Sequence, residues 1–423
     1  MKLFCTGDLH IGRRSSHLPD TEQHSCADAW LRAADTAIYE TADVVLLSGD
    51  IINKDNQFFE AAGPLEAGIQ KLIERKIHVC AVAGNHDYRA LTQFLHGIQG
   101  DYLHLLGVDG KWDSVIIEHG GQKLRVVGWS FPSEHVQANP LESFPDTGAS
   151  DIPTMGLVHC DIDSSGSKYA PVPLGDLKSQ HNICFWLTGH IHIPNAYNDT
   201  HPLVLNPGSL QAMDPGETGD HGPWIVEING GVVSQPQQLK TSTVKYCKFD
   251  IDVTDWEIDD IKRNIIDEVY DQSQSALLDN DAKIVSARVN ITGSTSLQTE
   301  MKSQLANTDE LKGDGFHIDQ INFAITPPID IELLAAGKGA AAIAARILLS
   351  IDAGTLKQEH AKLYEDAKAQ MDKAYDANGY ELILQNKTDS SEDVAPDEDC
   401  VLAALKSQCQ RLIGEMVEGS QAK

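Results

Sequence analysis

Five short polar motifs follow one another through the first half of this 423-residue sequence, each after an apolar run. Their aspartate, asparagine and histidine side chains offer the oxygen and nitrogen atoms that bind first-row transition metals. The motifs are Asp8-Leu9-His10, Gly49-Asp50, Gly84-Asn85-His86-Asp87, His159 and Gly189-His190-Ile191-His192. A single histidine after an apolar run is usually a hydrogen-bonded core residue, but five motifs in order favour one shared centre.

The apolar runs are typical of buried β-strands, because they are short and rich in branched and aromatic side chains. They cover residues 2–5, 44–47, 77–82, 155–158 and 184–187. The motifs therefore fall at the carboxyl ends of strands, where ligand sites of α/β sheets collect. A glycine precedes four of the polar positions, and a missing Cβ permits a sharp turn and a close approach to an ion.

These residue types predict a centre of two divalent metal ions. Asp50 has two carboxylate oxygens and is expected to bridge the ions. The remaining ligands are expected to be Asp8, His10 and His192 at one ion and Asn85, His159 and His190 at the other. If the Asp-X-His and His-X-His segments are extended, residues i and i+2 point the same way and converge. Mixed imidazole and carboxylate ligands favour manganese, iron or zinc over calcium or magnesium.

Two such ions lower the pKa of a bridging water and clamp a phosphate for in-line attack, so the predicted reaction is phosphoester hydrolysis. His86 is not needed as a ligand and is placed to protonate the leaving oxygen. Asp87 is expected to fix the tautomer and orientation of His86. Candidates for contacts with the substrate phosphate, each equally a candidate for a surface ion pair, are Arg13, Arg14, Lys54 and Arg89.

The composition describes an acidic globular protein of two or three domains. The formal net charge of −29 opposes non-specific binding to nucleic acid, which depends on lysine and arginine. A role on DNA would therefore need a local basic strip or a partner that carries the affinity. No apolar run is long enough to span a membrane, and the sequence enters a strand at once, leaving no room for a signal peptide. The 8 cysteines form no close pairs, which favours a reducing cytoplasm.

Three regions follow from the patterning along the chain. Residues 1–240 form the catalytic region, with helices expected over 28–41 and 64–76 between the strands. Residues 244–326 read as a β-α-β-α-β unit, with strands over 245–253, 284–292 and 316–325 and helices over 259–273 and 296–306. Residues 330–423 are expected to be helical, with a polar loop over 388–399. Their apolar stripes suit either a core of their own or a ridge for a partner helix.

The motifs of residues 1 to about 230 resemble the signature of the calcineurin-like metallophosphoesterases. The resemblance implies an α/β fold, a β-sandwich flanked by helices, here followed by a small α+β cap domain and a C-terminal helical region. A narrower resemblance is to the SbcD/YhaO-type DNA repair exonuclease subunit of SbcCD-like complexes. The segments that carry it are 8–12, 84–88, 206–210 (Asn-Pro-Gly-Ser-Leu) and 222–228.

This narrower resemblance implies a Mn-dependent DNA exonuclease and endonuclease of double-strand break repair. The cap would restrain or select DNA, and helices after the second and third motifs would pair two subunits into a homodimer. The C-terminal helices would dock on the coiled coil of an ABC-type, SbcC-like ATPase.

Other functions use the same ligands. A phosphodiesterase of small or cyclic nucleotides is an alternative, although a small substrate needs neither a cap nor a helical tail. A non-catalytic scaffold of the same fold is another, and the intact ligands and His86 argue against it. A protein phosphatase of this superfamily would carry an arginine soon after Asp50, and residues 51–55 contain none.

Overall fold

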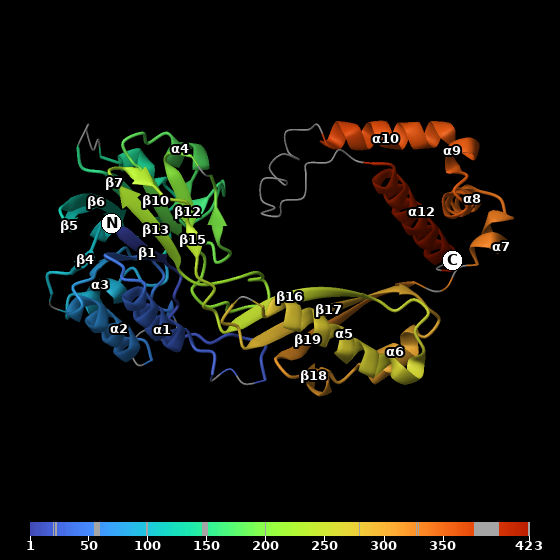
Figure 1. Cartoon of the computed structure of the whole chain (residues 1–423), viewed down its shortest axis with the longest axis horizontal. Helices are drawn as coiled ribbons and strands as arrows, with labels where there is room; N and C mark the ends of the chain where they lie inside the picture. Colours follow the sequence, from blue (N-terminus) through green and yellow to red (C-terminus); the bar gives the residue numbers. More distant parts are fainter. Residues whose placement is uncertain are drawn as a thin grey trace. The chain divides into compact units, whose positions relative to one another are not determined.

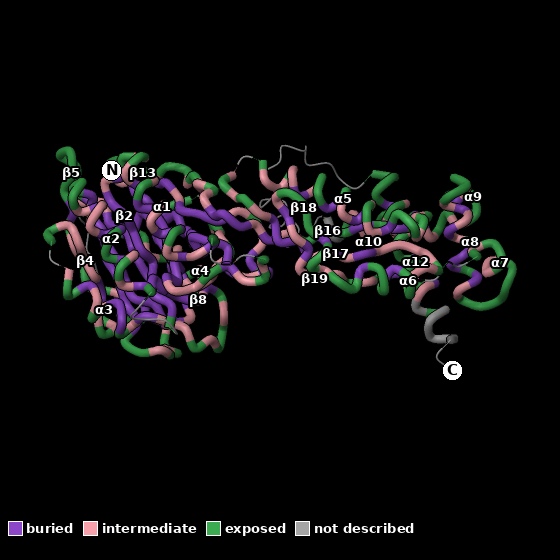
Figure 2. Tube along the Cα trace, turned by 90° about the horizontal axis from the view of Figure 1, so that it is seen from below, coloured by how far each residue is buried: buried purple, intermediate pink, exposed green. Residues whose placement is uncertain are grey.

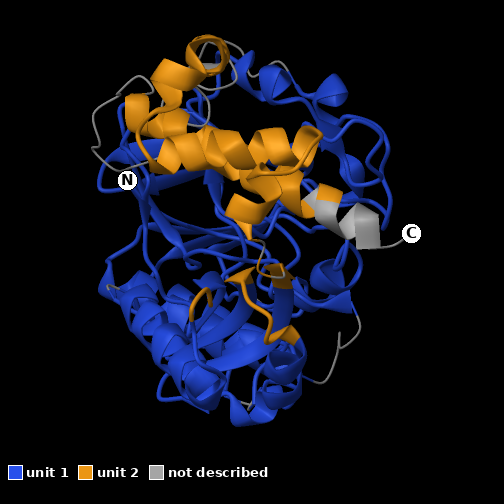
Figure 3. Cartoon of the chain, turned by 90° about the vertical axis from the view of Figure 1, so that its right-hand side faces the viewer, with its two compact units in different colours: residues 1–252, 256–291, 299–323 blue, residues 253–255, 292–298, 324–423 orange. Residues whose placement is uncertain are grey.

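The computed structural model of the protein describes residues 1–19, 21, 23–54, 60–98, 100–145, 151–198, 200–278, 280–326, 328, 330–375 and 397–421. The chain divides into two compact units, coloured separately in Figure 3. Unit 1 comprises residues 1–252, 256–291 and 299–323, and unit 2 comprises residues 253–255, 292–298 and 324–423. The domain limits expected from the sequence, 1–240, 244–326 and 330–423, stay predictions.

The predicted strands before the motifs are confirmed, and they belong to two different sheets. One sheet has the order β14-β13-β1-β2-β3-β4, with β15 paired to β13. Its strands are β1 (Lys2–Thr6), β2 (Val44–Leu47), β3 (His78–Ala81), β4 (Leu103–Leu105), β13 (Trp224–Asn229), β14 (Val232–Val233) and β15 (Gln237–Gln238). Strands β1 to β4 run parallel, so their carboxyl ends share one edge.

The other sheet has the order β11-β12-β10-β7-β6-β5. Its strands are β5 (Asp113–His119), β6 (Gln122–Trp129), β7 (Thr154–His159), β10 (Phe185–Gly189), β11 (Asn195–Ala196) and β12 (Leu203–Asn206). Strands β6, β7, β10 and β12 run parallel. A short ladder of β8 (Asp161–Ile162) and β9 (Pro171–Val172) lies outside it.

The two sheets pack face to face around a shared apolar core. Strands β2, β7, β10 and β12 are buried along their whole length, whereas β5 at one edge is largely exposed (Figure 2). Leu3 and Leu46 of the first sheet belong to the same core cluster as Leu157 and Leu187 of the second. Alternate residues of the first sheet, such as Phe4, face helices instead, because successive side chains of a strand point to opposite faces. The predicted α/β sandwich flanked by helices is therefore confirmed.

Helices cover the outer face of the first sheet (Figure 1). They are α1 (Cys26–Tyr39), α2 (Ala62–Glu74) and α3 (Ala90–Leu95). The first two confirm the helices expected over 28–41 and 64–76. Ser25 caps the N-terminus of α1, because its hydroxyl accepts a hydrogen bond from the Asp28 amide. On the second sheet, α4 (Leu174–Lys178) packs through Leu177 against an outer cluster that contains Trp186.

The β-α-β-α-β order of the cap is confirmed, with one short strand added. Its elements are β16 (Val244–Asp252), α5 (Ile261–Ala276), β17 (Ile284–Ser294), α6 (Gln298–Gln304), β18 (Lys312–Gly313) and β19 (Phe316–Thr326). The strands form one sheet in the order β16-β17-β19-β18. Helix α5 buries Ile261, Ile265 and Val269, a four-residue spacing that places them on one face.

The C-terminal region is helical, as expected. Its helices are α7 (Ile331–Ala335), α8 (Ala340–Asp352), α9 (Leu356–Glu359), α10 (Ala361–Tyr375) and α12 (Glu398–Gln421). Helices α8 and α12 pack through a small core that includes Leu348 and Ile413. Most of the loop expected over 388–399 lies outside the described residues. None of the described helices is both long and apolar enough to cross a membrane.

The contact between α1 and α2 depends on a glycine. A Cβ on Gly68 would lie 2.2 Å from Nε1 of Trp30, whose indole is fully buried and donates a hydrogen bond to the Pro64 carbonyl at 3.1 Å. A Cβ on Gly175, in α4, would meet nothing within 4 Å. Gly175 is therefore a suitable control for Gly68, because both lie in helices but only Gly68 lacks room for a Cβ.

We expect Gly68→Ala to lower the thermal unfolding midpoint by about 2–8 °C. A Cβ 2.2 Å from a fully buried ring puts the overpacking cost in the upper part of its usual range, about 2–3 kcal/mol. Alanine gains roughly 1 kcal/mol over glycine in a helix, which leaves a net loss of about 1–2 kcal/mol. Each 1 kcal/mol shifts the midpoint of a domain this large by about 2–4 °C. Tryptophan fluorescence during heating measures the shift. Gly175→Ala is the control and should leave the midpoint unchanged or higher; an equal fall in both variants would contradict the packing argument.

Candidate metal centre

The five motifs meet where the carboxyl edges of the two sheets come together. Asp8, Asp50 and Asn85 follow β1, β2 and β3 of the first sheet, whereas His159 ends β7 and His190 follows β10 of the second. The imidazole of His159 joins the sheets, since its Nδ1–H donates to the carbonyl of Ser48 at 2.9 Å.

The close approach of these loops requires glycine at two positions. A Cβ on Gly189 would lie 2.3 Å from the Ser48 carbonyl oxygen, and a Cβ on Gly84 would lie 2.1 Å from Oδ1 of Asp50. Any side chain at either position would push the two sheets or the two loops apart.

Asp8, His10 and His192 form one group of donors. One ligand atom from each lies within 4.8 Å of the others. The Nε2 atoms of His10 and His192 are 3.0 Å apart, so both rings face the same point. The Asp8 carboxylate also accepts the backbone N–H of His190 at 3.1 and 3.2 Å, which fixes its direction. These three side chains are named below as the first ligand group.

Asp50, His159 and His190 form the second ligand group, again with ligand atoms within 4.8 Å of one another. Nε2 of His159 lies 3.5 Å from Oδ2 of Asp50. The amide oxygen of Asn85 lies 3.1 Å from Nε2 of His159 and 3.2 Å from Nδ1 of His190. The structure therefore brings Asn85 to the place that the sequence assigned to it.

Asp50 stands between the groups. Its Oδ2 lies 3.9 Å from Nε2 of His10, a member of the first ligand group, as well as 3.5 Å from His159 of the second. The side chains of His10, Asp50 and His86 meet the same 4.8 Å limit, so Asp50 belongs to two of the three donor groups found in the described part of the chain. Imidazole and carboxylate donors arranged around one common carboxylate suit two divalent ions, with Asp50 as the shared ligand. The donor set present in the structure thus fits the expected metal pair.

The backbone at these positions does not meet the condition under which alternation would bring the side chains together. That argument applied if Asp-X-His and His-X-His were extended, but Asp8 and His10 have φ of 46° and 44°, and His190 has φ of 91°. These are left-handed conformations, which cost non-glycine residues of order 1–3 kcal/mol each. Hydrogen bonds from the amides of Asp8 and His10 to the carbonyls of Gly49 and Asp50, both 3.0 Å, hold the first loop. The side chains converge because the loops are hydrogen-bonded together, and the alternation of an extended strand plays no part.

The electrostatics place Asp50, His10 and His190 in metal-binding protonation states but favour the protonated form of His159. Burial would lower the pKa of His159, yet the neighbouring Asp50 and Asp8 carboxylates raise it to about 9. Burial alone would raise the pKa of Asp50, but the neighbouring His159, His10 and His86 hold it well below its usual range. Burial lowers the pKa of His10 to about 3, and burial with the charge of His159 lowers that of His190 to about 4. An ionised carboxylate and neutral imidazoles are the forms that coordinate a metal ion.

His86 lies at the rim of the centre. Its Nε2 is 3.9 Å from Oδ2 of Asp50, and its side chain is 34 % exposed. Its backbone N–H donates to Oδ1 of Asp50 at 2.9 Å, which ties the position of the third motif to that of the second. A partly exposed imidazole beside the shared carboxylate is positioned to reach a group that enters from solvent.

Asp87 joins two loops of the centre through hydrogen bonds that the sequence did not predict. Its fully buried carboxylate accepts the backbone N–H groups of Gly84, Ile51 and Ile52 at 2.8, 2.7 and 3.1 Å. These bonds hold the loop after Asp50 against the loop that carries Asn85. The expected orientation of His86 by Asp87 is not among them and stays a prediction.

The predicted phosphate-binding cations divide into two kinds. Arg13 pairs with Asp214 at 2.6 Å and Lys54 pairs with Glu134 at 2.6 Å, so both have the ion-pair partner that was the alternative. Arg14 and Arg89 are exposed, and the Arg89 guanidinium lies 5.4 Å from the ring centre of Tyr88. Phosphate contacts stay a prediction for all four.

Sequence reasoning missed the groups that hold the outer nitrogens of the ligand histidines. Nδ1 of His192 donates to Glu217 at 2.7 Å, whereas the carboxylate of Asp161 lies 3.8 Å from Nε2 of His190, beyond hydrogen-bond distance. The carbonyl of Ser48 holds His159 in the same way as Glu217 holds His192. No spacing in the sequence points to Glu217, which lies 25 positions after its partner, and a backbone carbonyl carries no sequence signal.

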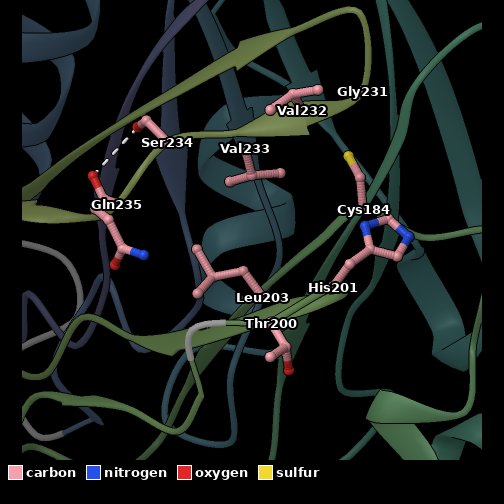
Figure 4. A pocket seen from close by; sticks show the side chains of 9 residues that line it. All are labelled: Cys184, Thr200, His201, Leu203, Gly231, Val232, Val233, Ser234 and Gln235. Atoms are coloured by element: carbon pink, nitrogen blue, oxygen red, sulfur yellow. Dashed lines mark hydrogen bonds between the residues drawn. The ribbon is translucent and has the colours of Figure 1, made fainter.

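A separate cavity of about 260 Å³ lies away from the centre (Figure 4). It is lined by Cys184, Thr200, His201, Leu203, Gly231, Val232, Val233, Ser234 and Gln235. Cys184 precedes β10 and His190 follows it, so the cavity and the ligand histidines lie at opposite ends of that strand. The cavity shares no residue with either ligand group.

Comparison with known proteins agrees with this site. Residues 1–194 match the model of the calcineurin-like phosphoesterase family. The chain is 26 % identical over 258 residues to the uncharacterized metallophosphoesterase YhaO of Bacillus subtilis, covering 59 % of this chain and 62 % of that protein. It is 24 % identical over 241 residues to the DNA double-strand break repair protein Mre11 of Nanoarchaeum equitans, covering 52 % and 64 %. The chain thus spans less than two thirds of the length of these curated relatives.

A dimetal phosphatase from Danio rerio has a similar solved structure, with a TM-score of 0.35 and 14 % identity over 54 % of this chain and 92 % of that one. The matched family region, residues 1–194, contains all five motifs and both ligand groups. The chain therefore carries a calcineurin-like metallophosphoesterase domain.

Proposed function

We propose that this protein is a Mn-dependent DNA nuclease that hydrolyses phosphodiester bonds in double-strand break repair. The observation that carries the proposal is the shared position of Asp50 between two groups of metal-binding side chains at the meeting edge of two sheets. That arrangement supports hydrolysis of a phosphate ester by two metal ions. The choice of DNA as substrate rests on the further features described next.

Each side chain of the centre has a role in this proposal. Asp8, His10 and His192 would hold one ion, Asn85, His159 and His190 would hold the other, and Asp50 would hold both. The ions supply an activated water and stabilise charge on the phosphate. His86 binds the leaving oxygen and donates its proton to it, since its partly exposed ring stands beside Asp50. Asp87 keeps the loops of Asp50 and Asn85 together.

The position of the cap is evidence in favour of a large substrate. The cap is attached to the loop that follows the first motif: Nδ1 of His17 lies 2.8 Å from Asp319 of β19, and Ser286 of β17 donates to the His17 carbonyl at 3.0 Å. An added domain fixed beside a ligand loop suits a polymer that extends beyond the reacting phosphate. The name of the relative Mre11 points the same way.

The C-terminal helices carry exposed apolar side chains, which is evidence in favour of a protein partner. Leu333 of α7, Ile343 of α8, and Leu412 and Met416 of α12 are exposed by 73, 50, 40 and 36 %. Apolar side chains on helices that pack together suit helix-in-groove recognition. We propose that these helices dock on the coiled coil of an SbcC-like ABC-type ATPase. Because the net charge of −29 opposes independent DNA binding, such a partner would supply much of the affinity.

Pairing of two subunits completes the proposal. Helices α2 and α3 follow the second and third motifs and would form the homodimer interface. A molar mass in solution near that of one 46.1 kDa chain would contradict this part alone.

Asp50→Asn is expected to abolish Mn-dependent cleavage of labelled linear DNA and to remove binding of at least one Mn²⁺ ion. The amide cannot provide the negative charge that both ions share. The measurements are product formation on a denaturing gel and Mn²⁺ binding by electron paramagnetic resonance.

His119→Ala is the matched control for Asp50→Asn. That exposed histidine pairs with Asp43, at the opposite end of β2 from Asp50, and its replacement should change neither quantity. DNA cleavage that survives in Asp50→Asn would refute the proposed centre. Turnover of a small phosphodiester without DNA cleavage in the wild type would favour the small-substrate enzyme or a nuclease that needs its partner to hold DNA.

His86→Ala is expected to slow DNA cleavage by about 10²–10⁴-fold while both Mn²⁺ ions stay bound, because general-acid catalysis contributes that much. The loss should shrink for a thymidine p-nitrophenyl phosphodiester, whose leaving group needs no proton. Single-turnover rates on the two substrates give the comparison. An equal loss on both substrates would show that His86 acts in some other way than by protonating the leaving oxygen.

A further inference from the structure

The ring nitrogen of His192 that points away from the ligand group is hydrogen-bonded to a carboxylate. The Nδ1–H donates to Oε1 of Glu217 at 2.7 Å, while Nε2 of the same ring faces His10 at 3.0 Å within the first ligand group. The Glu217 contact therefore fixes which nitrogen carries the proton and which one offers its lone pair to an ion.

Glu217 is itself fixed on its other side. Oε2 accepts the hydroxyl of Ser209 at 3.0 Å and the backbone N–H of Met213 at 2.9 Å. The residue is 7 % exposed, so water does not compete freely for these bonds. With both oxygens engaged, the carboxylate cannot turn away from His192 without breaking hydrogen bonds in a buried site.

The backbone around His192 is held by the same segment. The side-chain amide of Asn206 donates to the carbonyls of Ile191 and Ile193 at 2.6 and 3.0 Å, and the Ser209 amide donates to the His192 carbonyl at 2.8 Å. The Asn206-Pro207-Gly208-Ser209 turn thus holds three consecutive carbonyls, and Glu217 extends this hold to the ring. The turn therefore ends β12 and also fixes the backbone of a ligand histidine.

The other ligand histidines of the second sheet are held less strongly. His159 donates to a neutral backbone carbonyl, and Asp161 lies 3.8 Å from His190, beyond hydrogen-bond distance. Hydrogen bonds to a charged acceptor are roughly twice as strong as those between neutral groups. Of these three side chains, His192 has the strongest outer support. Because His192 belongs to the first ligand group alone, losing that support should affect one ion.

We propose that Glu217 is a positioning residue for the metal ion of the first ligand group, acting through His192, and that Ser209 and the Met213 amide hold it for this task. The inference rests on the proposed function, because it takes the first ligand group to bind an ion. Glu217 itself touches neither the ion nor the substrate. Carboxylates that support a ligand histidine commonly contribute about 10–100-fold to metal affinity.

The test is a Mn²⁺ titration of the full chain, followed by electron paramagnetic resonance and isothermal calorimetry. Wild-type protein should bind two ions. Glu217→Gln keeps the size of the side chain but removes its charge, and it should weaken one ion about 10–100-fold while the other stays within about threefold. Asp161→Asn is the matched control at the sister histidine and should keep both affinities within about threefold.

Ser209→Ala provides a second variant should Glu217→Gln fail to fold, which the thermal midpoint reveals. It removes one of the bonds that hold Glu217 and should weaken the same ion by a smaller factor, about 3–10-fold, from the loss of one hydrogen bond of about 1 kcal/mol. A wild type that binds fewer than two ions would defeat the proposed function. Two ions in the wild type with unchanged affinities in Glu217→Gln, or in Ser209→Ala where Glu217→Gln does not fold, would overturn the role of Glu217, as would equal weakening of both ions.

Discussion

The buried carboxylate of Asp50 is the group on which the arrangement of the rest depends. It is 2 % exposed, and a charge so buried is costly unless neighbouring groups stabilise it. The His86 amide donates to it, and the imidazoles of His10 and His159 approach it from different sheets. The two sheets must therefore end at the same place. The glycines allow the two sheets to approach closely, and the hydrogen bonds between their loops keep the sheet ends together.

Holding the metal-binding side chains so close together costs conformational free energy, and contacts in the surrounding fold offset that cost. Asp8, His10 and Asp50 adopt left-handed backbone conformations that are unfavourable for residues with a side chain. The loops keep these conformations because their amides and carbonyls are paired across the two motifs, and because Asp87 accepts three amides at their base. The core between the sheets supplies the rigid platform below. Preorganised donors are the consequence, and they are what binding of two ions requires.

The sequence predicted the parts of this centre that depend on periodicity and residue type. Buried parallel strands read as apolar runs, so their ends could be located, and the ligand residues found there do come together in the structure. Strands β5 and β6 were missed, since β5 is largely exposed and mixes polar with apolar residues. Glu217 was missed because the partner of a ring nitrogen follows from tertiary structure alone. Arg13 lies 201 positions from its partner Asp214, a separation at which no local pattern operates.

The same long-range contacts join the cap to the centre. The Tyr246 hydroxyl, at the start of β16, lies 2.6 Å from the carbonyl of Ser16 and 3.0 Å from that of Met213. The amide of Met213 in turn holds Glu217, which holds His192. One end of the cap sheet is thus three contacts away from a ligand histidine. Met213 therefore supports both sides: its carbonyl accepts from the first strand of the cap sheet, and its amide holds the carboxylate behind a ligand histidine.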